Sequence, residues 1–158
     1  MTDINDFLFQ GGAKAFQFND IGDSVEGRVV NAELRQQTSI EGNKLTWDNG
    51  DPRMQLVITL ATKLHDNDDD DGMRTIYAKG GRYDTATGEG SSMRDAIADA
   101  VRTMGEKRLE EGDELVVAFT GLGQAKRGYS APKLYTAGFR KAKAGVDAAA
   151  LFSSAPAE

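Results

Sequence analysis

The stretch that decides the fold covers residues 109–143 and reads LEEGDELVVAFTGLGQAKRGYSAPKLYTAGFRKAK. Apolar side chains alternate over 115–119 and predict a strand, because side chains two residues apart share one face of a sheet. A Gly-rich connection over 121–132 leads into a second alternating run over 133–140. The stretch therefore predicts a β-hairpin with a long connection at its tip.

The same stretch is locally basic in an acidic chain. Residues 126–143 carry six basic side chains and no acidic one, whereas the net charge of the whole chain is −6. Residues 1–72 contain 14 acids and 6 bases, and residues 73–158 contain 11 acids and 13 bases. Overall acidity disfavours a general nucleic-acid binder, but phosphate contacts depend on local potential. A hairpin that binds a polyanion is the simplest explanation of this segregation.

Composition excludes several classes of protein. With 158 residues, 39% of them hydrophobic and 28% charged, the chain is typical of one globular domain. No apolar run approaches the roughly 18 residues of a membrane span, and no signal peptide is visible. Cysteine is absent, which excludes disulfides, thiolate catalysis and cysteine-based zinc sites. We therefore expect a cytoplasmic protein with no membrane contact and no cofactor.

Three regions are expected along the chain. They are an N-terminal arm over 1–20, one folded domain over 21–143 and a flexible tail over 144–158. The arm is rich in phenylalanine around a Gly-Gly pair. Because isolated exposed phenylalanines are a liability, they are expected to dock on the domain or on a second subunit. A homodimer is thus one expected partner arrangement.

Three strands are predicted before the helix. The first covers 24–34, and its inward face switches between Val29 and Val30, which predicts a bulge or a sharp bend. The second covers 54–60 with strict alternation, and the third covers 74–79.

An acidic segment, HDNDDDDG, separates the second and third of these strands at residues 65–72. A calcium-binding EF-hand loop requires Gly at its sixth position and Glu at its twelfth. Counted from Asn67, Gly72 is sixth but Ala78 is twelfth. The segment therefore predicts a solvated, mobile acidic loop in preference to a metal site.

One helix is predicted from Ser92, whose hydroxyl can cap it while Asp95 completes a capping box, to a stop at Gly105. The resulting order, β-β-β-α-β-β, predicts an all-β domain with one helix, the five-stranded OB-fold barrel. In that fold the ligand face is bordered by the loops between strands 1 and 2 and between strands 4 and 5. In this chain these loops cover 38–52 and 121–132.

The sequence also resembles a known family. The matching runs resemble the signature of single-stranded-DNA-binding proteins encoded by bacteriophages of actinobacteria, and they extend over most of residues 8–143. They are GDELVVAFTG at 112–121, AKRGY at 125–129, APKLYTA at 131–137, PRMQLVITL at 52–60 and FQGG at 9–12. The resemblance implies an OB-fold protein that coats single-stranded DNA during phage replication or recombination in the host cytoplasm, among replication or recombination proteins.

One feature departs from the better-known bacterial relatives. Their C-termini end in an acidic tip with an apolar last residue, which recruits partner proteins. The final residues here, SAPAE over 154–158, do not match that pattern. The resemblance therefore does not imply recruitment of partners through the tail.

Binding of a single strand needs cations along a groove and flat faces on which bases stack, each worth about 1–3 kcal/mol. The aromatic candidates are Trp47, Tyr77, Tyr83, Tyr129 and Tyr135. The cationic candidates are Lys126, Arg127 and Lys133, followed by Lys79, Arg82, Arg53, Arg35 and Lys44. Other cations on or after the helix have acids nearby and are expected to be ordinary surface charges, namely Arg94, Arg102, Lys107 and Arg108.

Two other classes of function were weighed. Residues 123–128 have the glycine spacing of a P-loop, but Tyr129-Ser130 follows where the phosphate-binding lysine is required, and the single His65 lies beside the acidic segment. The sequence therefore predicts no enzyme. The alternative is a non-catalytic OB-like protein-interaction module of a phage assembly, whose binding need not weaken steeply with salt.

Overall fold

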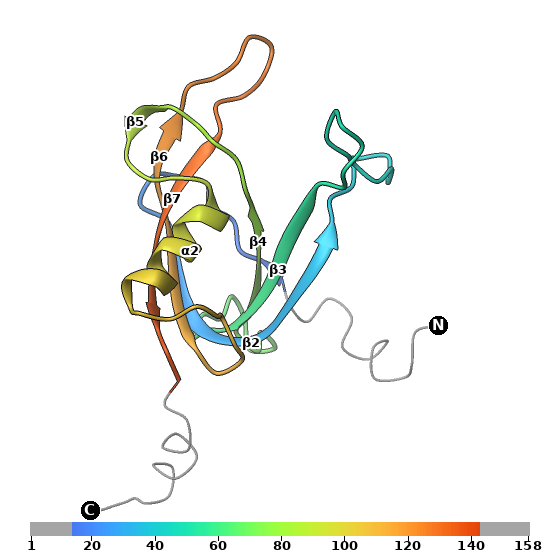
Figure 1. The fold of residues 1–158 in the computed structure, drawn as a ribbon. Coiled ribbons are helices and arrows are strands. Elements are labelled where there is room, and N and C mark those ends of the chain that lie inside the picture. Colours follow the sequence, from blue (N-terminus) through green and yellow to red (C-terminus); the bar gives the residue numbers. More distant parts are fainter. Residues whose placement is uncertain (1–13, 143–158) are drawn as a thin grey trace, which may run out of the picture.

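The structure is a computed structural model that describes residues 14–142. These residues form one seven-stranded sheet and one helix (Figure 1). In chain order the elements are β1 (Lys14–Ala15), β2 (Ser24–Gln36), β3 (Met54–Ala61), β4 (Met73–Lys79), β5 (Thr85–Gly88), α2 (Met93–Thr103), β6 (Glu114–Gly123) and β7 (Lys133–Arg140). The prediction of a mostly β domain with one helix is confirmed. The predicted tail over 144–158 and most of the predicted arm lie outside the described residues.

The five longer strands and the helix follow the predicted order, but the predicted closed, five-stranded barrel is not present. The strands run β1-β4-β3-β2-β6-β5, with β7 on the other edge of β6. Within residues 14–142 no ladder joins β4 to β7, so the sheet stays open. The outer edge of β7 is instead occupied by a bridge between Ser91 and Tyr135 and by α2, which packs on it. The structure also contains two short strands, β1 and β5, whose residues are exposed. Neither has the apolar alternation from which the other strands were predicted.

Strand β2 is bent and shared by two neighbours. Its first part, Ser24–Arg28, pairs with β6, and its second part, Arg28–Gln36, pairs with β3. The register shifts between Val29 and Asn31, which confirms the predicted bulge. The apolar residues after the bulge are not buried as the alternation suggested, because the far half of β2 runs beyond the core with β3. Leu34 there is 64% exposed.

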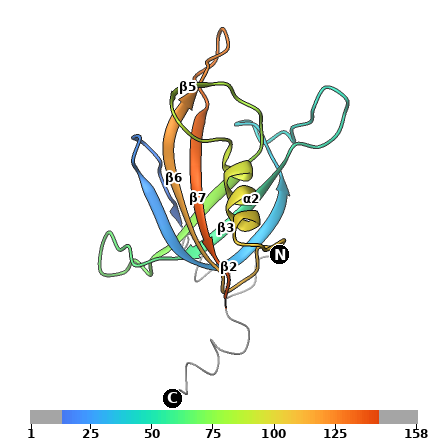
Figure 2. The same ribbon diagram turned by 60° about the vertical axis from the view of Figure 1, so that its left-hand side comes forward.

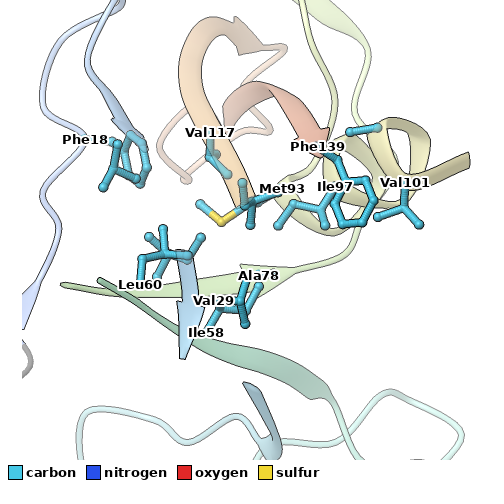
Figure 3. Close-up of a cluster of buried hydrophobic side chains, with 14 of the residues drawn as sticks. Phe18, Val29, Ile58, Leu60, Ala78, Met93, Ile97, Val101, Val117 and Phe139 are labelled. Atoms are coloured by element: carbon cyan, nitrogen blue, oxygen red, sulfur yellow. The ribbon is translucent and has the colours of Figure 1, made fainter. Parts of the chain in front are cut away.

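The core lies between the sheet and α2. Ser92 caps the helix by accepting a hydrogen bond from the Asp95 N–H, and Gly105 follows its end with φ of 77°. Met93, Ile97 and Val101 are buried and lie beside Phe139 of β7 (Figure 3). The helix thereby covers part of the opening that an additional ladder would otherwise have closed.

The acidic segment is organised around a buried ion pair. Arg74 of β4 donates two hydrogen bonds to Asp70, at 2.9 and 2.6 Å, and the two side chains are only 5% and 1% exposed. Asp70 also accepts hydrogen bonds from the backbone N–H groups of Gly72 and Asp66, at 2.9 and 2.7 Å. These contacts hold the pKa of the Asp70 carboxyl well below its usual range, the Arg74 hydrogen bonds contributing most. The prediction of a merely solvated acidic loop was therefore wrong for Asp70.

The same pair fixes the beginning of the described chain. Lys14 of β1 lies 3.2 Å from Asp66 and 3.9 Å from Asp70, and its backbone pairs with Arg74. From β1 the chain continues to Phe18, which is buried in the core. The last residues of the predicted arm are thus built into the sheet.

We expect Asp70→Asn to lower the melting temperature by several degrees, because it leaves the buried Arg74 guanidinium with only the exposed Asp66, 3.5 Å away, as a charge partner. Asp99→Asn is the matched control, since it removes an exposed pair with Arg102 on α2 and should change little. Thermal unfolding followed by circular dichroism at neutral pH compares the two. Equal effects would show that the Asp70 pair has no special structural weight.

The effect of Asp70→Asn on the melting temperature is expected to depend on pH. A carboxyl whose pKa is depressed by folding contributes stability that is fully present above its ordinary pKa, about 3.9. That stability is lost as the pH falls toward the lowered pKa that Asp70 has in the folded protein. The difference in melting temperature between wild type and Asp70→Asn should therefore narrow below about pH 4.

Candidate nucleic-acid interface

Strand register brings several candidate residues onto one face. Arg35 of β2 lies opposite Gln55 of β3, which lies opposite Lys79 of β4. Directly opposite residues in an antiparallel sheet point to the same side, and Tyr77 shares that side because it is two residues from Lys79. The intervening Ile76 is buried in the core. Arg35, Tyr77 and Lys79 therefore define an outer face of β2–β4, facing away from the core.

The predicted loop over 38–52 is an ordered double turn. Three backbone hydrogen bonds close a ring across its base: Gln37 N–H donates to Arg53 O at 2.7 Å, Arg53 N–H to Leu45 O at 3.0 Å, and Leu45 N–H to Gln37 O at 2.8 Å. The first of the two turns lies between Gln37 and Leu45, and the second lies between Leu45 and Arg53. This arrangement gives fixed positions to side chains that the sequence placed in a loop.

Trp47 is displayed on this double turn. The Arg53 guanidinium carbon lies 4.6 Å from the Trp47 ring centroid, and the indole remains 49% exposed. Arg53 Nε is buried and has no hydrogen-bond partner within the described residues, so the stack is the main contact that orients this guanidinium. Arg53 precedes Gln55 by two residues, which connects Trp47 with the outer face of β2–β4. Lys44, also a candidate, is exposed on the double turn.

Arg35 is not a free cation. Its guanidinium donates two hydrogen bonds of 2.9 Å to Glu33, which lies on the same face. This pairing lowers the pKa of Glu33 and raises that of Arg35. A phosphate at Arg35 would have to share the guanidinium with Glu33. Lys79 has no ion-pair partner within residues 14–142.

The tip of the β6–β7 hairpin carries the most accessible candidates. Lys126, Arg127 and Tyr129 are exposed, Tyr129 to 76%. A tight turn closed by the Tyr129 N–H and Lys126 O at 2.9 Å holds them, with Gly128 at φ of 83°. Neither of the two cations forms an ion pair in the described part of the chain. Their charges are therefore available to a ligand.

Two candidates on β7 are engaged inside the domain. The Lys133 ammonium donates to the carbonyl oxygen of Phe18 and lies 5.3 Å from the Phe119 ring centroid. Tyr135 is half-buried, and its ring packs edge-on against the ring of Phe18, with 5.1 Å between the two ring centroids. Burial raises the pKa of Tyr135, with a smaller contribution from Tyr83. Lys133 and Tyr135 thus hold the N-terminal segment against β7.

The chain between β4 and β5 crosses from the outer face of β2–β4 to the β6–β7 hairpin (Figure 1). It contains the exposed candidates Arg82 and Tyr83, and its Asp84 carbonyl accepts a hydrogen bond of 2.7 Å from the Gln124 N–H. This crossing lies between the two groups of candidates and joins them into one band.

One further cation lies near this band, and it is paired with an acid, as the sequence predicted. Arg94, interpreted as an ordinary charge on the helix, lies with its guanidinium against Gly80, so a Cβ at this position would displace the guanidinium. Gly80 follows Lys79 directly, so Arg94 lies close to Lys79, but its guanidinium also pairs with Asp95 at 3.1 Å. The available signal was weak: only the glycine pair after the third strand indicates a close approach by another side chain.

The basic end of the hairpin stretch is neutralised by acids from elsewhere. Arg140 pairs with Glu114 across the β6–β7 ladder, and Lys141 pairs with Glu110. Lys141 also lies 3.5 Å from the buried Asp113 carboxylate. These contacts raise the pKa of Arg140 and of Lys141. Of the basic residues that the sequence groups after residue 125, those at the hairpin tip therefore stay apart from acids in the folded domain, whereas Arg140 and Lys141 do not.

Comparison of the chain with protein-family models, with curated proteins and with solved structures gave no match. The family resemblance therefore stays a prediction. Among residues 14–142, no group of three or more His, Cys, Asp or Glu is arranged to hold a metal ion. The helix in this part of the chain is neither long nor apolar enough to cross a membrane.

We expect Arg53→Gln to make Trp47 more accessible to acrylamide, because the guanidinium covers part of the indole. The chain has one tryptophan, so its fluorescence reports this site alone. The free energy of unfolding should fall by about 0.5–1 kcal/mol, the usual worth of an exposed cation–π contact. Arg82→Gln is the control and should leave quenching unchanged. Equal quenching of all three proteins would contradict the stack.

Proposed function

We propose that this chain binds single-stranded DNA with little sequence preference. The observation that carries the proposal is the band, in which three parts of the molecule expose cations and aromatic rings on either side of the crossing chain with Arg82 and Tyr83. These are the double turn with Trp47 and Arg53, the outer face of β2–β4 with Arg35, Tyr77 and Lys79, and the hairpin tip with Lys126, Arg127 and Tyr129.

The aromatic side chains favour a single strand over a duplex. Trp47, Tyr77, Tyr83 and Tyr129 are between 42% and 76% exposed. Exposed rings offer faces for stacking, and base faces are accessible only where the bases are not stacked in a duplex. Because every base has such a face, stacking tolerates any sequence.

The charge distribution supports phosphate binding despite the net charge of −6. The double turn and the hairpin tip project from one end of the sheet, and the acidic segment lies at the other end (Figure 2). Part of the acidic charge is neutralised there by Arg74 and Lys14. Local potential at the band is therefore set mainly by Lys79, Arg82 and the hairpin-tip cations.

The fold supports the same function. We interpret the open sheet as an OB fold whose last seam is not closed, because strand order, helix position and the two bordering loops follow the OB pattern. The resemblance to phage proteins supports a role in protecting single strands during replication or recombination in the host cytoplasm. That assignment rests on the sequence resemblance alone.

Titration of Trp47 fluorescence with oligo-dT at increasing salt tests the proposal, with fluorescence anisotropy of a labelled oligonucleotide as an independent readout. Affinity should fall steeply as salt rises, because phosphate binding releases counterions. Duplex DNA of the same length should bind more weakly. If anisotropy detects no binding at low salt, the proposal is wrong and a protein-interaction module is the better interpretation.

Neutralising the hairpin tip with Lys126→Gln and Arg127→Gln should weaken binding and reduce the salt dependence. Loss of two phosphate contacts lowers the slope of log K against log salt by about 1.4 for a single strand. Lys107→Gln with Arg108→Gln is a charge-matched control at the start of the connection to β6, away from the tip. An unchanged slope in the hairpin variant would place the phosphate contacts elsewhere.

A further inference from the structure

The far half of β2 has a strand on only one of its edges. β3 pairs with it as far as Gln36, but β6 pairs only with Ser24–Arg28. Beyond the bulge, residues 31–36 therefore form part of the margin of the sheet (Figure 1). An edge of this length offers unpaired backbone groups to another strand.

The direction of those backbone groups follows from the neighbouring ladder. Gln37 N–H donates to Arg53 O on the β3 side, and N–H and C=O directions alternate along a strand. The backbone groups of Ala32, Leu34 and Gln36 therefore point to the free edge. Among the described residues, nothing forms a hydrogen bond with them.

The centre of this edge carries an apolar side chain. Leu34 is 64% exposed and lies opposite Leu56, on the side of the sheet that faces the core. Natural edge strands are commonly protected by proline, by an inward-pointing charge or by a short length. Residues 31–36, which read NAELRQ, have none of these three; they follow a bulge, and their two charges, Glu33 and Arg35, pair with each other. The edge is thus suited to pairing rather than protected from it.

We propose that a second copy of this chain pairs antiparallel with the far half of β2, with a two-fold axis at Leu34. The two Leu34 residues would then exchange two backbone hydrogen bonds, which requires that their N–H and C=O groups face the edge, as they do. Ala32 would form the next hydrogen-bonded pair with Gln36 of the second copy. Two observations select this pairing register. Ala32, Leu34 and Gln36 are the residues whose backbone groups face the edge, and the flanking Glu33 and Arg35 carry opposite charges.

Those charges are complementary under the two-fold operation. Glu33 comes to lie opposite Arg35 of the second copy, and Arg35 opposite Glu33 of the second copy. Both are non-hydrogen-bonded pairs, in which opposite side chains approach most closely. Within one chain Glu33 and Arg35 already project on one face and pair at 2.9 Å. The dimer therefore combines two ion pairs into a network of four charges.

One end of the partner strand would approach the rest of the domain beside Ala32. A hollow of about 560 Å³ lies between Ala32 and the segment that leads into β6. Its lining residues are Ala32, Leu109, Glu110, Glu111, Asp113, Lys141 and Ala142. The end of the second copy's strand, at Gln36 and Gln37, would lie beside this hollow.

A dimer of this form would extend the proposed binding surface, a consequence that rests on the proposed function. The strands β4-β3-β2 of one copy would continue into β2-β3-β4 of the other, joining their outer faces across the axis. The dimer itself is independent of DNA and is tested without it.

Charge exchange at the two positions tests the proposal by sedimentation velocity on the full chain. Wild type should sediment as a dimer of the 17.0 kDa chain. Glu33→Arg alone and Arg35→Glu alone each place like charges opposite one another and should weaken self-association at least tenfold. A mixture of these two variants should recover dimers, and so should the double variant Glu33→Arg with Arg35→Glu. Circular dichroism checks that each variant is folded.

Two results from the wild type and the single variants would overturn the proposal, and two further results, from the double variant and from Leu34→Pro, would contradict it. One is a wild type that remains monomeric at about 100 µM, well above the micromolar range of weak specific interfaces. The other is self-association of both single variants as strong as that of wild type, which would place the interface elsewhere on the chain. If a single variant fails to fold, loss of dimers in the double variant would contradict the proposal in the same way. A dimer that Leu34→Pro leaves intact would contradict the hydrogen bonding at the axis.

Discussion

The arrangement of this domain depends on one bent strand that is shared by two neighbours. At the bend, Val29 N–H donates to Asp113 O at 2.8 Å and Gly112 N–H donates to Val29 O at 2.7 Å. The buried Asp113 carboxylate accepts hydrogen bonds from the N–H groups of Glu110 and Ala142, at 2.7 and 2.9 Å. These contacts fix the bulge against the start of β6 and the end of β7. The β2–β3 and β6–β7 hairpins are thereby directed toward one end of the sheet.

The positive potential that this domain offers to a ligand depends more on which cations are paired with acids than on how many cations there are. Arg74 and Arg140 contribute little positive potential to a ligand because acids neutralise them within the described chain. Lys126 and Arg127 have no such acid, and they lie on a tip away from the acidic segment. A net negative chain can therefore present a positive band, because screening and pairing limit the reach of the remaining charges.

The sequence predicted the elements well and the contacts between them less well. Local signals were sufficient for the alternation in β3 and β6, for the Ser92 cap and for the bulge after Val29. They were insufficient wherever a residue's role depends on a distant partner. The burial of Asp70 requires Arg74 on the next strand, and the approach of Arg94 to Gly80 depends on the docking of α2. The open seam could not be predicted either, since what occupies the edge of β7 is a matter of tertiary packing.

The candidate site shows the same division. Exposure of Tyr129 and of the hairpin cations could be expected from a polar Gly-rich loop, whereas the engagement of Lys133 with Phe18 could not, because the two are far apart in the sequence. The ring of hydrogen bonds at the base of the double turn has a consequence for association. Backbone hydrogen bonds join Gln37, Leu45 and Arg53 in a closed ring. The backbone around Trp47 therefore loses its conformational freedom during folding, before any ligand binds. A ligand that stacks on this indole therefore meets a surface that needs little further ordering, and less of its interaction energy is offset by entropy.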